Sequence, residues 1–429
     1  MRLSKTGMST TKLSNIDEMY PGQSILLQSG QLSQVGAGIY AYNNVPLLVK
    51  RNLCKIITEE MNKCDAIEIE LPTLQPEKMW KDSGRYDQYV NNGTMLTIQT
   101  NKGNFCLAPT AEEAVLEFAK ERLKTYKNLP TTYYQIGEKY RNEIRTRGYL
   151  LKGKSFPMFD AYSFDENEEG MVKSYNIIKE AYLKIFKKIE LPVMPIAADN
   201  GEIGGKKSEE FMMISKMGED KILVDKKTGL GLNTEILERE NAKEYLEKEY
   251  GITDISQLEE AKTIELGHIF QIGLRYSEMM DGTFINKEGK KNLYYMGCYG
   301  IGISRVVATI YEANVLRDKQ GNPNGFSLPK ALAPYKLQII CKMDDEEKVK
   351  IAEKLYSDLQ ENGIDCIIDD RENIQIGAKI KDCRILGTPN MLIIGDKFNG
   401  TDYEIENIKT EEKVVCKSID EIIKAIELV

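Results

Sequence analysis

Apolar positions in the first third of the chain recur with the period of a helix in some stretches and with that of a strand in others. Residues 46–64 carry apolar side chains mostly at three- and four-residue steps, which predicts an amphipathic helix. Residues 67–71 alternate apolar with acidic side chains and stop at Pro72, so they predict a strand. The runs 95–98 and 132–136 are rich in β-forming side chains and predict further strands. The pattern indicates a domain that mixes helices with strands.

An apolar run at 114–123 predicts another helix, and the residues before it resemble a helix start. Thr110 is expected to be the N-cap, with Glu113 as its capping-box partner. Farther along, the charged stretch 235–262 predicts a peripheral helix, and 265–280 returns to the apolar character of a strand. None of these elements defines a function by itself.

The composition changes after Pro329 and Pro334. Strands are predicted at 337–341, 366–368 and 391–394, with helices at 347–362 and 378–386 between them. This βαβαβ alternation predicts a separate, small α/β domain over residues 335–429.

Two arginine-bearing segments carry the first chemical signal. Arg141 follows the strand predicted at 132–136, and Arg305 opens an apolar run at 306–312 that predicts a buried helix. The residues before Arg305, Gly300-Ile301-Gly302, are expected to form a glycine-rich turn. Guanidinium groups match phosphate oxygens in pairs, and glycine lets the backbone approach a ligand closely. The two segments therefore predict a polyphosphate site that needs no Walker loop.

A basic loop and an aromatic strand follow Arg141. The basic residues are Arg145, Arg147, Lys152 and Lys154, and the strand begins at Phe156. Such a segment could be a solvated hairpin. It could equally hold phosphates on the loop and stack a base on an aromatic ring.

Composition removes several classes of protein. The 429 residues are 41% apolar and 29% charged, which is typical of a soluble globular chain, and the net charge of −8 argues against a generally basic surface. No run is long enough for a membrane span. The eight cysteines form no CxxC pair, which fits a reducing cytoplasm, and with His268 as the single histidine neither a histidine zinc site nor Ser–His catalysis is expected. The first sixteen residues are basic but lack an apolar face, so we expect no targeting segment.

The whole chain resembles the prolyl-tRNA synthetases of the bacterial type, which are class II aminoacyl-tRNA synthetases. The segment 51–76 resembles motif 1, the segment 140–156 motif 2, and the segment 296–305 motif 3. Three further segments resemble those that line the family's amino-acid pocket: 109–113, 204–211 and 267–273. The residues from Asp369 to Asp382 resemble the family's anticodon-binding domain.

The resemblance implies an α+β fold of two domains. Residues 1–330 are expected to form a class II catalytic domain, an antiparallel sheet flanked by helices rather than a Rossmann sheet. Residues 335–429 are expected to form the mixed α/β anticodon-binding domain. The long editing domain usual between motifs 2 and 3 is missing, and the short stretch 235–262 stands in its place.

The resemblance also implies the reaction and its residues. The chain is expected to activate L-proline with ATP to prolyl-adenylate and to transfer it to tRNA(Pro), with Mg²⁺ bridging the phosphates and no metal ligand identified. Arg141, at the α-phosphate, and Arg305, at the γ-phosphate, are the expected catalytic residues. The expected ATP site comprises Arg141, Glu143, Lys152, Phe156, Gln271, Gly302 and Arg305. The expected proline site comprises Thr110, Glu112, Arg141, Phe164, Glu210, His268, Cys298 and Gly300. Arg145, Arg371 and Lys379 are expected to contact tRNA.

Some positions depart from the family pattern. Lys152 and Lys154 stand where the family usually has arginine, and lysine is a weaker phosphate partner because it cannot bind in the bidentate manner. Glu209 replaces a usual histidine, and Leu48 and Asp65 replace glycines.

The expected partners are tRNA(Pro), L-proline and a second copy of the chain, paired through the segment around Pro72. No membrane is expected, and a separate protein is expected to correct mischarged tRNA. One alternative remains open. A synthetase paralogue could activate proline for another acceptor or only sense the amino acid, although the intact arginine pair argues against a pure sensor. A dimeric scaffold would make the phosphate residues coincidental, so we discard it.

Overall fold

The computed structural model describes residues 1–8, 12–225 and 227–428. The chain divides into two compact units. The first comprises Met1–Leu53, Gly148–Leu150 and Val307–Val429, and the second comprises Cys54–Arg147 and Leu151–Val306. The units do not coincide with the expected domains 1–330 and 335–429, which remain a prediction. Residues 9–11 of the segment considered for targeting lie outside the described residues.

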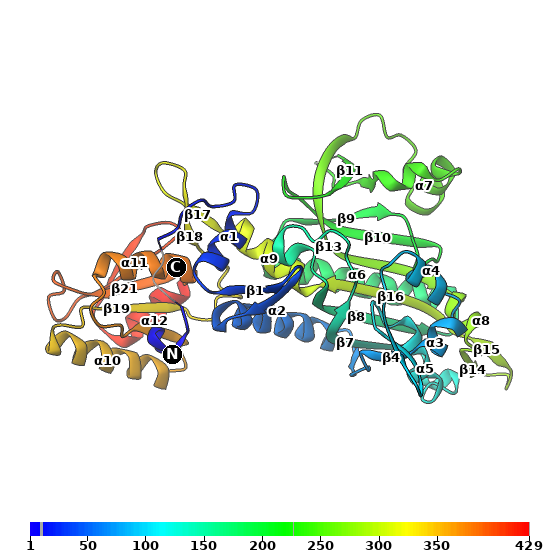
Figure 1. Ribbon diagram of the computed structural model, residues 1–429, viewed down its shortest axis with the longest axis horizontal. Helices are drawn as coiled ribbons and strands as arrows, with labels where there is room; N and C mark the ends of the chain where they lie inside the picture. Colours follow the sequence, from blue (N-terminus) through cyan, green and yellow to red (C-terminus); the bar gives the residue numbers. More distant parts are fainter. Residues whose placement is uncertain (9–11, 226, 429) are drawn as a thin grey trace. The chain divides into compact units, whose positions relative to one another are not determined.

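The second unit is built on one large sheet (Figure 1), with the strand order β10-β9-β12-β11-β13-β16-β8-β7-β3 and a further pairing of β10 with β13. The strands are β3 (Ile67–Glu68), β7 (Thr131–Tyr140), β8 (Ser155–Asp165), β9 (Val193–Ala198), β10 (Lys207–Ile214), β11 (Asp220–Val224), β12 (Gly231–Asn233), β13 (Glu259–Gly273) and β16 (Tyr295–Gly302). The strands pair antiparallel except that β12 pairs with β9, and β3 with β7, in parallel. The antiparallel catalytic sheet expected from the sequence is confirmed.

A long helix, α6 (Glu168–Lys188), packs on one face of this sheet against β8, β13 and β16. Its buried residues recur every three or four positions, for example Met171, Tyr175, Ile178 and Tyr182, as an amphipathic helix requires. The Asn167 side chain caps the helix by accepting the Gly170 N–H at 2.9 Å. Burial of these apolar side chains therefore stabilises the packing of α6 on the sheet that carries the site.

Smaller elements complete the second unit. The helices are α3 (Glu77–Asp82), α4 (Tyr86–Asn91), α5 (Glu112–Lys120), α7 (Ala242–Tyr250) and α8 (Arg275–Met279). The strands β4 (Leu74–Pro76), β5 (Leu96–Thr100) and β6 (Gly103–Leu107) form one small sheet, and β14 (Thr283–Ile285) and β15 (Lys291–Leu293) form a hairpin. The expected helix 235–262 is wrong in extent. Its helical part is a 3₁₀ turn, Thr234–Glu238, followed by α7, and β13 already begins at Glu259.

The first unit contains the α/β fold expected after residue 335. Its sheet has the order β20-β19-β21-β22-β23, parallel in β20, β19 and β21 and antiparallel beyond. The strands are β19 (Leu337–Cys341), β20 (Cys366–Asp369), β21 (Asn390–Ile394), β22 (Tyr403–Asn407) and β23 (Lys413–Cys416). The helices are α10 (Glu346–Glu361), α11 (Ile376–Leu386) and α12 (Ile419–Leu428). The predicted βαβαβ alternation is confirmed.

The remaining elements of the first unit are α1 (Pro21–Gln28) and the hairpins β1 (Leu32–Gly36) with β2 (Ile39–Tyr42) and β17 (Val315–Arg317) with β18 (Pro323–Phe326). Two helices contain residues of both units: α2 (Asn44–Asn62) and α9 (Ile303–Ala313). Among the described residues, no helix combines the length and the apolar character needed to cross a membrane.

Candidate active site

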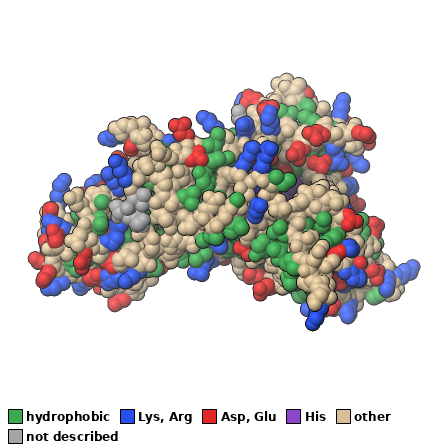
Figure 2. Space-filling model, viewed as in Figure 1, with side chains coloured by type: hydrophobic (Ala, Val, Ile, Leu, Met, Phe, Trp, Pro, Cys, Tyr) green, Lys and Arg blue, Asp and Glu red, His purple; other side chains and the backbone are tan. Residues whose placement is uncertain are grey.

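A cavity of about 420 Å³ lies over the central strands of the second unit. It brings together most residues that the sequence singled out: Thr110, Glu112, Arg141, Glu143, Lys152, Phe156, Glu210, His268, Cys298, Gly300, Gly302 and Arg305. On the face shown in Figure 2, Lys and Arg side chains (blue) gather beside the small purple area that marks histidine. Segments far apart in the sequence therefore form one cavity.

The floor of the cavity includes β16, and here one expectation was wrong. Gly300 and Gly302 lie in a strand that leads directly into α9, and they do not form a turn. A Cβ added at Gly300 would meet its nearest neighbour, the Met158 sulfur, at 3.9 Å, and Gly300 lines the cavity. Its missing side chain keeps the floor of the cavity open.

Arg141 lies directly after β7, at the mouth of the motif 2 loop. Its Nε donates to the Pro109 carbonyl at 3.3 Å, and the guanidinium carbon lies 5.4 Å from the centre of the Phe156 ring. Arg141 forms no ion pair with any described residue. Its positive charge is therefore open to an anionic ligand, next to an aromatic face on which a base could stack.

Arg305 projects from the first turn of α9 and is held on two sides. Its Nε donates to the Leu151 carbonyl at 3.1 Å, and its Nη1 donates to the Glu265 carboxylate at 2.7 Å. The charge-assisted bond to Glu265 fixes the position of the guanidinium. Glu265 was not among the residues expected from the sequence.

An irregularity in β13 explains how Glu265 reaches the cavity. The pairing with β10 places Phe211 opposite Gly267 but Met212 opposite Glu265, so Leu266 is an extra residue, a β-bulge. The bulge shifts the alternation of side chains between the two faces of β13. No periodic sequence pattern signals it.

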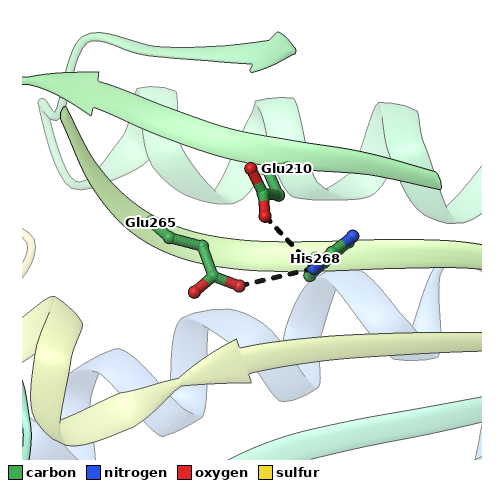
Figure 3. A group of neighbouring side chains, drawn as sticks. All are labelled: Glu210, Glu265 and His268. Carbon is green, nitrogen blue, oxygen red and sulfur yellow. Dashed lines mark ion pairs between the residues drawn. The ribbon is translucent and has the colours of Figure 1, made fainter. Parts of the chain in front are cut away.

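Glu210, Glu265 and His268 form a cluster in the cavity (Figure 3). The His268 Nδ1 lies 3.5 Å from a Glu265 oxygen and 3.7 Å from a Glu210 oxygen, and the His268 ring stacks on Phe270 with centroids 3.8 Å apart. Burial raises the pKa of Glu210 to about 7. Burial alone would also raise the pKa of Glu265, but the hydrogen bond with His268 and the charge of Arg305 outweigh it and lower the pKa. Of these two neighbouring carboxylates, Glu210 is therefore the more readily protonated and Glu265 the more readily ionised.

The other end of the cavity is centred on Glu112. Thr110 Oγ1 donates to Glu112 Oε1 at 2.9 Å, and the Cys298 thiol lies 3.2 Å from the same oxygen. The expected capping role of Thr110 is wrong: α5 has Ala111 at its N-cap and no side-chain cap, because the Thr110 hydroxyl is used by Glu112. Glu113 bonds elsewhere, to Ser83 Oγ at 2.7 Å.

The motif 2 loop carries the lysines that replace arginine. Lys152 Nζ lies 3.8 Å from a Glu143 oxygen and 3.7 Å from a Glu219 oxygen, so acidic neighbours partly offset its charge. Lys154 lies outside the cavity lining, with its Nζ 3.5 Å from the Asn142 side-chain oxygen. Lysine therefore contributes little fixed positive charge at this edge.

Glu209, which replaces the usual histidine, faces away from the cavity. The Tyr175 hydroxyl and the Lys179 ammonium both donate to its carboxylate at 2.7 Å, and both residues belong to α6. The charged substitution is therefore satisfied by hydrogen bonds on the helix side of the sheet.

Two expected ligand residues do not line the cavity. Phe164 is fully buried on the same face of β8 as Tyr162, but it lies past the end of the cavity, packed against Tyr133 and Tyr294. Gln271 follows Phe270 in β13, is 7% exposed and is also absent from the lining. Strand periodicity gives the face of a side chain but not where a cavity ends.

The residues expected to contact tRNA fall into two groups. Arg145 is exposed on the loop after Arg141, as a contact residue must be. Lys379, in contrast, is fully buried, and its Nζ donates to the carbonyls of Cys341 and Asp369, both at 3.0 Å. Its expected contact with tRNA is therefore wrong, since the ammonium ties α11 to β19 and β20.

Arg371 serves the same internal network. Its Nη2 donates to Asp369 at 2.6 Å and to Asp382 at 2.9 Å, and its side chain is 13% exposed. Both carboxylates are buried. A contact between Arg371 and tRNA would have to compete with these bonds, so the expected role is not carried forward.

Sequence reasoning also missed Arg85, which lies behind Glu112. The signal was the triplet Ser83-Gly84-Arg85 after the short helix α3: Gly84 has a φ of +72°, a conformation that favours glycine, and it lets the chain reverse.

Comparison with known families matches this geometry. Residues 95–314 match the tRNA synthetase class II core domain (G, H, P, S and T), and residues 336–427 match the anticodon binding domain. The antiparallel sheet, the two cavity arginines and these matches define a class II aminoacyl-tRNA synthetase.

Relatives identify the branch of this class. The proline–tRNA ligase of Rickettsia africae is 36% identical over 429 aligned residues that cover 98% of each chain, and that of Pelagibacter ubique is 36% identical over 433 residues that cover 96% of each. The chain therefore belongs to the proline–tRNA ligase family.

Solved structures agree on the fold. A prolyl-tRNA synthetase from Cryptosporidium parvum, complexed with halofuginone and AMPPNP, has a TM-score of 0.74 at 15% identity, covering 97% of this chain and 77% of that one. The same protein with L-proline and AMP has a TM-score of 0.73 at 14% identity, covering 97% and 80%. At this identity the likeness concerns the fold alone.

Proposed function

We propose that the chain activates L-proline with ATP to prolyl-adenylate and transfers the prolyl group to tRNA(Pro). The observation that carries this proposal is a single cavity lined both by Arg141 and Arg305 and by the buried carboxylate of Glu112. Phosphates and a carboxylate are anions, whereas the amino group of proline is a cation. The cavity offers a group of opposite charge to each of them, which suits the attack of the proline carboxylate on the α-phosphate.

The ATP end needs neutralising charge and a stacking surface. Arg141, without an ion-pair partner among the described residues, would bind the α-phosphate, and Arg305, fixed by Glu265, would bind the γ-phosphate. Phe156 would stack on adenine, with Glu143 near its amino group and Lys152 and Gly302 at the edge. No general base is required, because the attacking carboxylate is already ionised.

The amino-acid end would be formed by Thr110, Glu112, Glu210, His268, Cys298 and Gly300. Glu112 and Thr110 would hold the secondary ammonium of proline in a charge-assisted contact. His268 would shape the pocket, since its ring is already stacked on Phe270.

Magnesium fits one edge of the cavity. Glu210, Glu265 and His268 each place a donor atom within 4.8 Å of the others, and Mg²⁺ prefers carboxylate oxygens over nitrogen. Glu265 lies beside Arg305, where the phosphates would lie, so we propose Glu265 as the residue that would hold the ion. Magnesium would neutralise charge on the phosphates.

The remaining partners follow from the family. Arg145 would contact the acceptor end of tRNA, and the anticodon-binding domain would contact the anticodon. We further propose a homodimer formed through the segment around Pro72, a cytoplasmic location that fits eight cysteines without a CxxC pair, and a separate protein that corrects mischarged tRNA.

The test is ATP–pyrophosphate exchange with a panel of amino acids, followed by charging of tRNA(Pro). Proline should support the fastest exchange. Arg141→Ala and Arg305→Ala should each lower exchange on the order of 10²–10³-fold, by analogy with loss of a transition-state donor. Arg145→Ala is the matched control, because it removes an exposed arginine of the same loop and should reduce charging but not exchange. Faster exchange with another amino acid would refute the proposal.

A further inference from the structure

Arg85 is a fully buried arginine directly behind the amino-acid end of the cavity. It follows α3 and Gly84, and its backbone N–H donates to the Trp80 carbonyl at 3.1 Å, which turns the side chain inward. Its exposed fraction is 1%. A guanidinium so deeply buried must be compensated, because an unpaired charge in the interior is costly.

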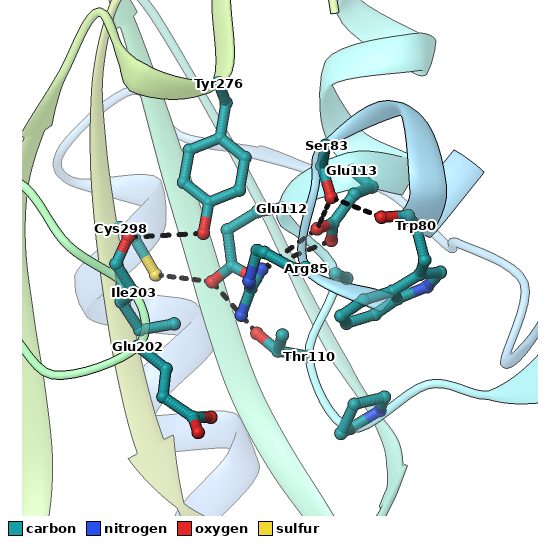
Figure 4. Close-up of polar contacts among 12 residues, drawn as sticks. Trp80, Ser83, Arg85, Thr110, Glu112, Glu113, Glu202, Ile203, Tyr276 and Cys298 are labelled. Carbon is teal, nitrogen blue, oxygen red and sulfur yellow. Dashed lines mark hydrogen bonds and ion pairs between the residues drawn. The ribbon is translucent and has the colours of Figure 1, made fainter. Parts of the chain in front are cut away.

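Two carboxylates provide the compensation (Figure 4). Arg85 Nη1 donates to Glu112 Oε2 at 3.0 Å and to Glu113 Oε1 at 3.1 Å. Aromatic rings surround the rest of the group: its central carbon lies 5.1 Å from the Trp80 ring centre and 5.3 Å from that of Tyr276. The guanidinium is thus both paired and walled off from water.

The two oxygens of Glu112 have different surroundings. Arg85 takes Oε2, whereas Oε1 receives the hydroxyl of Thr110 and the thiol of Cys298, both of which line the cavity. Arg85 therefore holds the carboxylate from behind and leaves Oε1 turned toward the ligand side.

The charges of this cluster do not balance. The titratable groups that face Glu112 are Arg85, Glu113, Tyr89, Tyr162, Tyr276 and Cys298. Burial raises the pKa of each tyrosine and of the thiol, so these four are neutral at neutral pH. Among the described residues that face Glu112, one positive group therefore stands against two carboxylates.

Arg85 also decides how those carboxylates ionise. Burial alone would raise the pKa of Glu112, but Arg85 and the Thr110 hydroxyl outweigh it and bring the pKa below its ordinary value. Burial raises the pKa of Glu113 even though Arg85 opposes it. Of the two carboxylates, the one that faces the cavity is thus the more readily ionised.

We propose that Arg85 is a positioning and specificity residue for the substrate amino group: it orients Glu112 and leaves the cluster short of one positive charge, which a cationic amine supplies. The inference rests on the proposed binding of proline at Glu112. It adds the reason why the pocket selects a charged amine over a neutral group of the same shape. An uncharged ring would leave Glu112 and Glu113 to share Arg85, with no second positive charge beside Glu112.

Loss of the guanidinium should act through protonation. In Arg85→Met, two buried carboxylates lie side by side without a counter-charge, so one proton should be taken up and shared between Glu112 and Glu113. Each unit by which the pKa of Glu112 exceeds the assay pH leaves about a tenfold smaller ionised fraction. The KM for proline should therefore rise on the order of 10–100-fold at pH 7, recover partly as pH is raised to 9, and leave the KM for ATP within about threefold.

The double variant Arg85→Met/Glu113→Gln is the decisive comparison. It removes one positive and one negative group together and restores the single excess negative charge on Glu112. The KM for proline should fall at least about tenfold relative to Arg85→Met, and the pH dependence should flatten. Glu113→Gln alone, which keeps Arg85 paired with Glu112, should change the KM less than Arg85→Met does.

A second readout uses tetrahydrofuran-2-carboxylate, in which oxygen replaces the ring amine of proline, as a competitive inhibitor of exchange. The wild-type enzyme should bind it far more weakly than proline, and Arg85→Met should narrow that gap. Arg85→Lys keeps the charge and should retain most of the discrimination. Circular dichroism and thermal unfolding identify variants that fail to fold, in which case the double variant and Arg85→Lys carry the test.

The outcomes are separable. If wild-type enzyme shows no exchange with proline, the proposed function fails. If wild-type enzyme is active but folded Arg85→Met keeps its KM for proline and its discrimination, the role of Arg85 is overturned. A double variant no better than Arg85→Met at any pH between 6 and 9 would also overturn it, because the effect would then be structural.

Discussion

Two glycines of β16, on opposite faces of the strand, allow activity to be separated from stability. A Cβ at Gly300 would find its nearest neighbour, the Met158 sulfur, at 3.9 Å, on the cavity side. A Cβ at Gly297 would lie 2.2 Å from the Tyr299 hydroxyl and 2.8 Å from the Ser163 hydroxyl. Gly300→Ala should therefore fill ligand space without a clash, whereas Gly297→Ala should clash without touching ligand.

The magnitudes follow from these distances. Alanine is more favourable than glycine inside a strand by roughly 0.5–1 kcal/mol, so Gly300→Ala should unfold at or slightly above the wild-type temperature. Its methyl group in a filled pocket should cost about 1–3 kcal/mol of binding, as overpacking does, which corresponds to roughly 5- to 150-fold in KM or kcat/KM. Gly297→Ala must displace the 2.9 Å hydrogen bond between Ser163 and Tyr299 and should lose about 2–4 kcal/mol of folding stability.

The assay is pyrophosphate exchange with proline and ATP varied in turn, beside thermal unfolding of the same preparations. Gly300→Ala should lose activity at an unchanged unfolding temperature. Gly297→Ala should unfold several degrees lower yet keep a near-normal KM for proline at a temperature where it is folded. Wild-type kinetics in Gly300→Ala would refute the assignment of this face of β16 to the substrates.

Three further outcomes are expected. Burial raises the pKa of Asp165 to about 6 from an ordinary 3.8, so the folded state binds the proton more tightly and its stability falls as pH rises through that interval. Asp165→Asn should therefore match the wild type in thermal unfolding at pH 4 and exceed it in stability at pH 8 by on the order of 1–3 kcal/mol. An equal gain in stability at both pH values would contradict burial of the charge as the cause. Lys379→Met leaves the carbonyls of Cys341 and Asp369 without the ammonium donor. It should therefore lower the free energy of unfolding by about 1–3 kcal/mol, while the tRNA affinity of the folded protein stays unchanged. Weaker tRNA binding at unchanged stability would instead support a contact between Lys379 and tRNA. Alanine is smaller than proline, and lost methylenes give only about 1–3 kcal/mol of discrimination each, so alanyl-tRNA(Pro) should form at a measurable rate and should not be hydrolysed by this chain faster than by buffer.

The fold could be predicted largely because its signals are local. The βαβαβ alternation after residue 335 and the strands around Arg141 were read from apolar period and strand composition, and the pairings confirm them. Most cavity residues were reached through motif resemblance, since no periodic pattern brings Thr110 and Arg305 together. What failed was the extent of elements: the glycines before Arg305 continue a strand, and the charged stretch after residue 235 is α-helical only over Ala242–Tyr250.

The buried charges mark a second limit. Lys379 and Arg371 were expected to contact tRNA because their segment resembles the anticodon-binding domain, yet they bond inward to Asp369 and Asp382. Arg85 was overlooked because no motif marks it and only the fold places it against two acids. Composition can count charges, but it cannot show which of them neutralise one another.

Glu265 is the residue of the site that regular alternation conceals. It stands three positions before His268, so in an unbroken strand the two side chains would point to opposite faces. The bulge at Leu266 returns them to one face, where Glu265 lies 2.7 Å from Arg305 and 3.5 Å from His268. The arginine proposed to bind the γ-phosphate is therefore fixed by an acid that lies on the cavity face because Leu266 is bulged out of the pairing. A regular strand in which Leu266 was paired would keep every charged residue of the site and still turn Glu265 away from Arg305, so the phosphate site depends on the register of β13 as much as on the residues it contains.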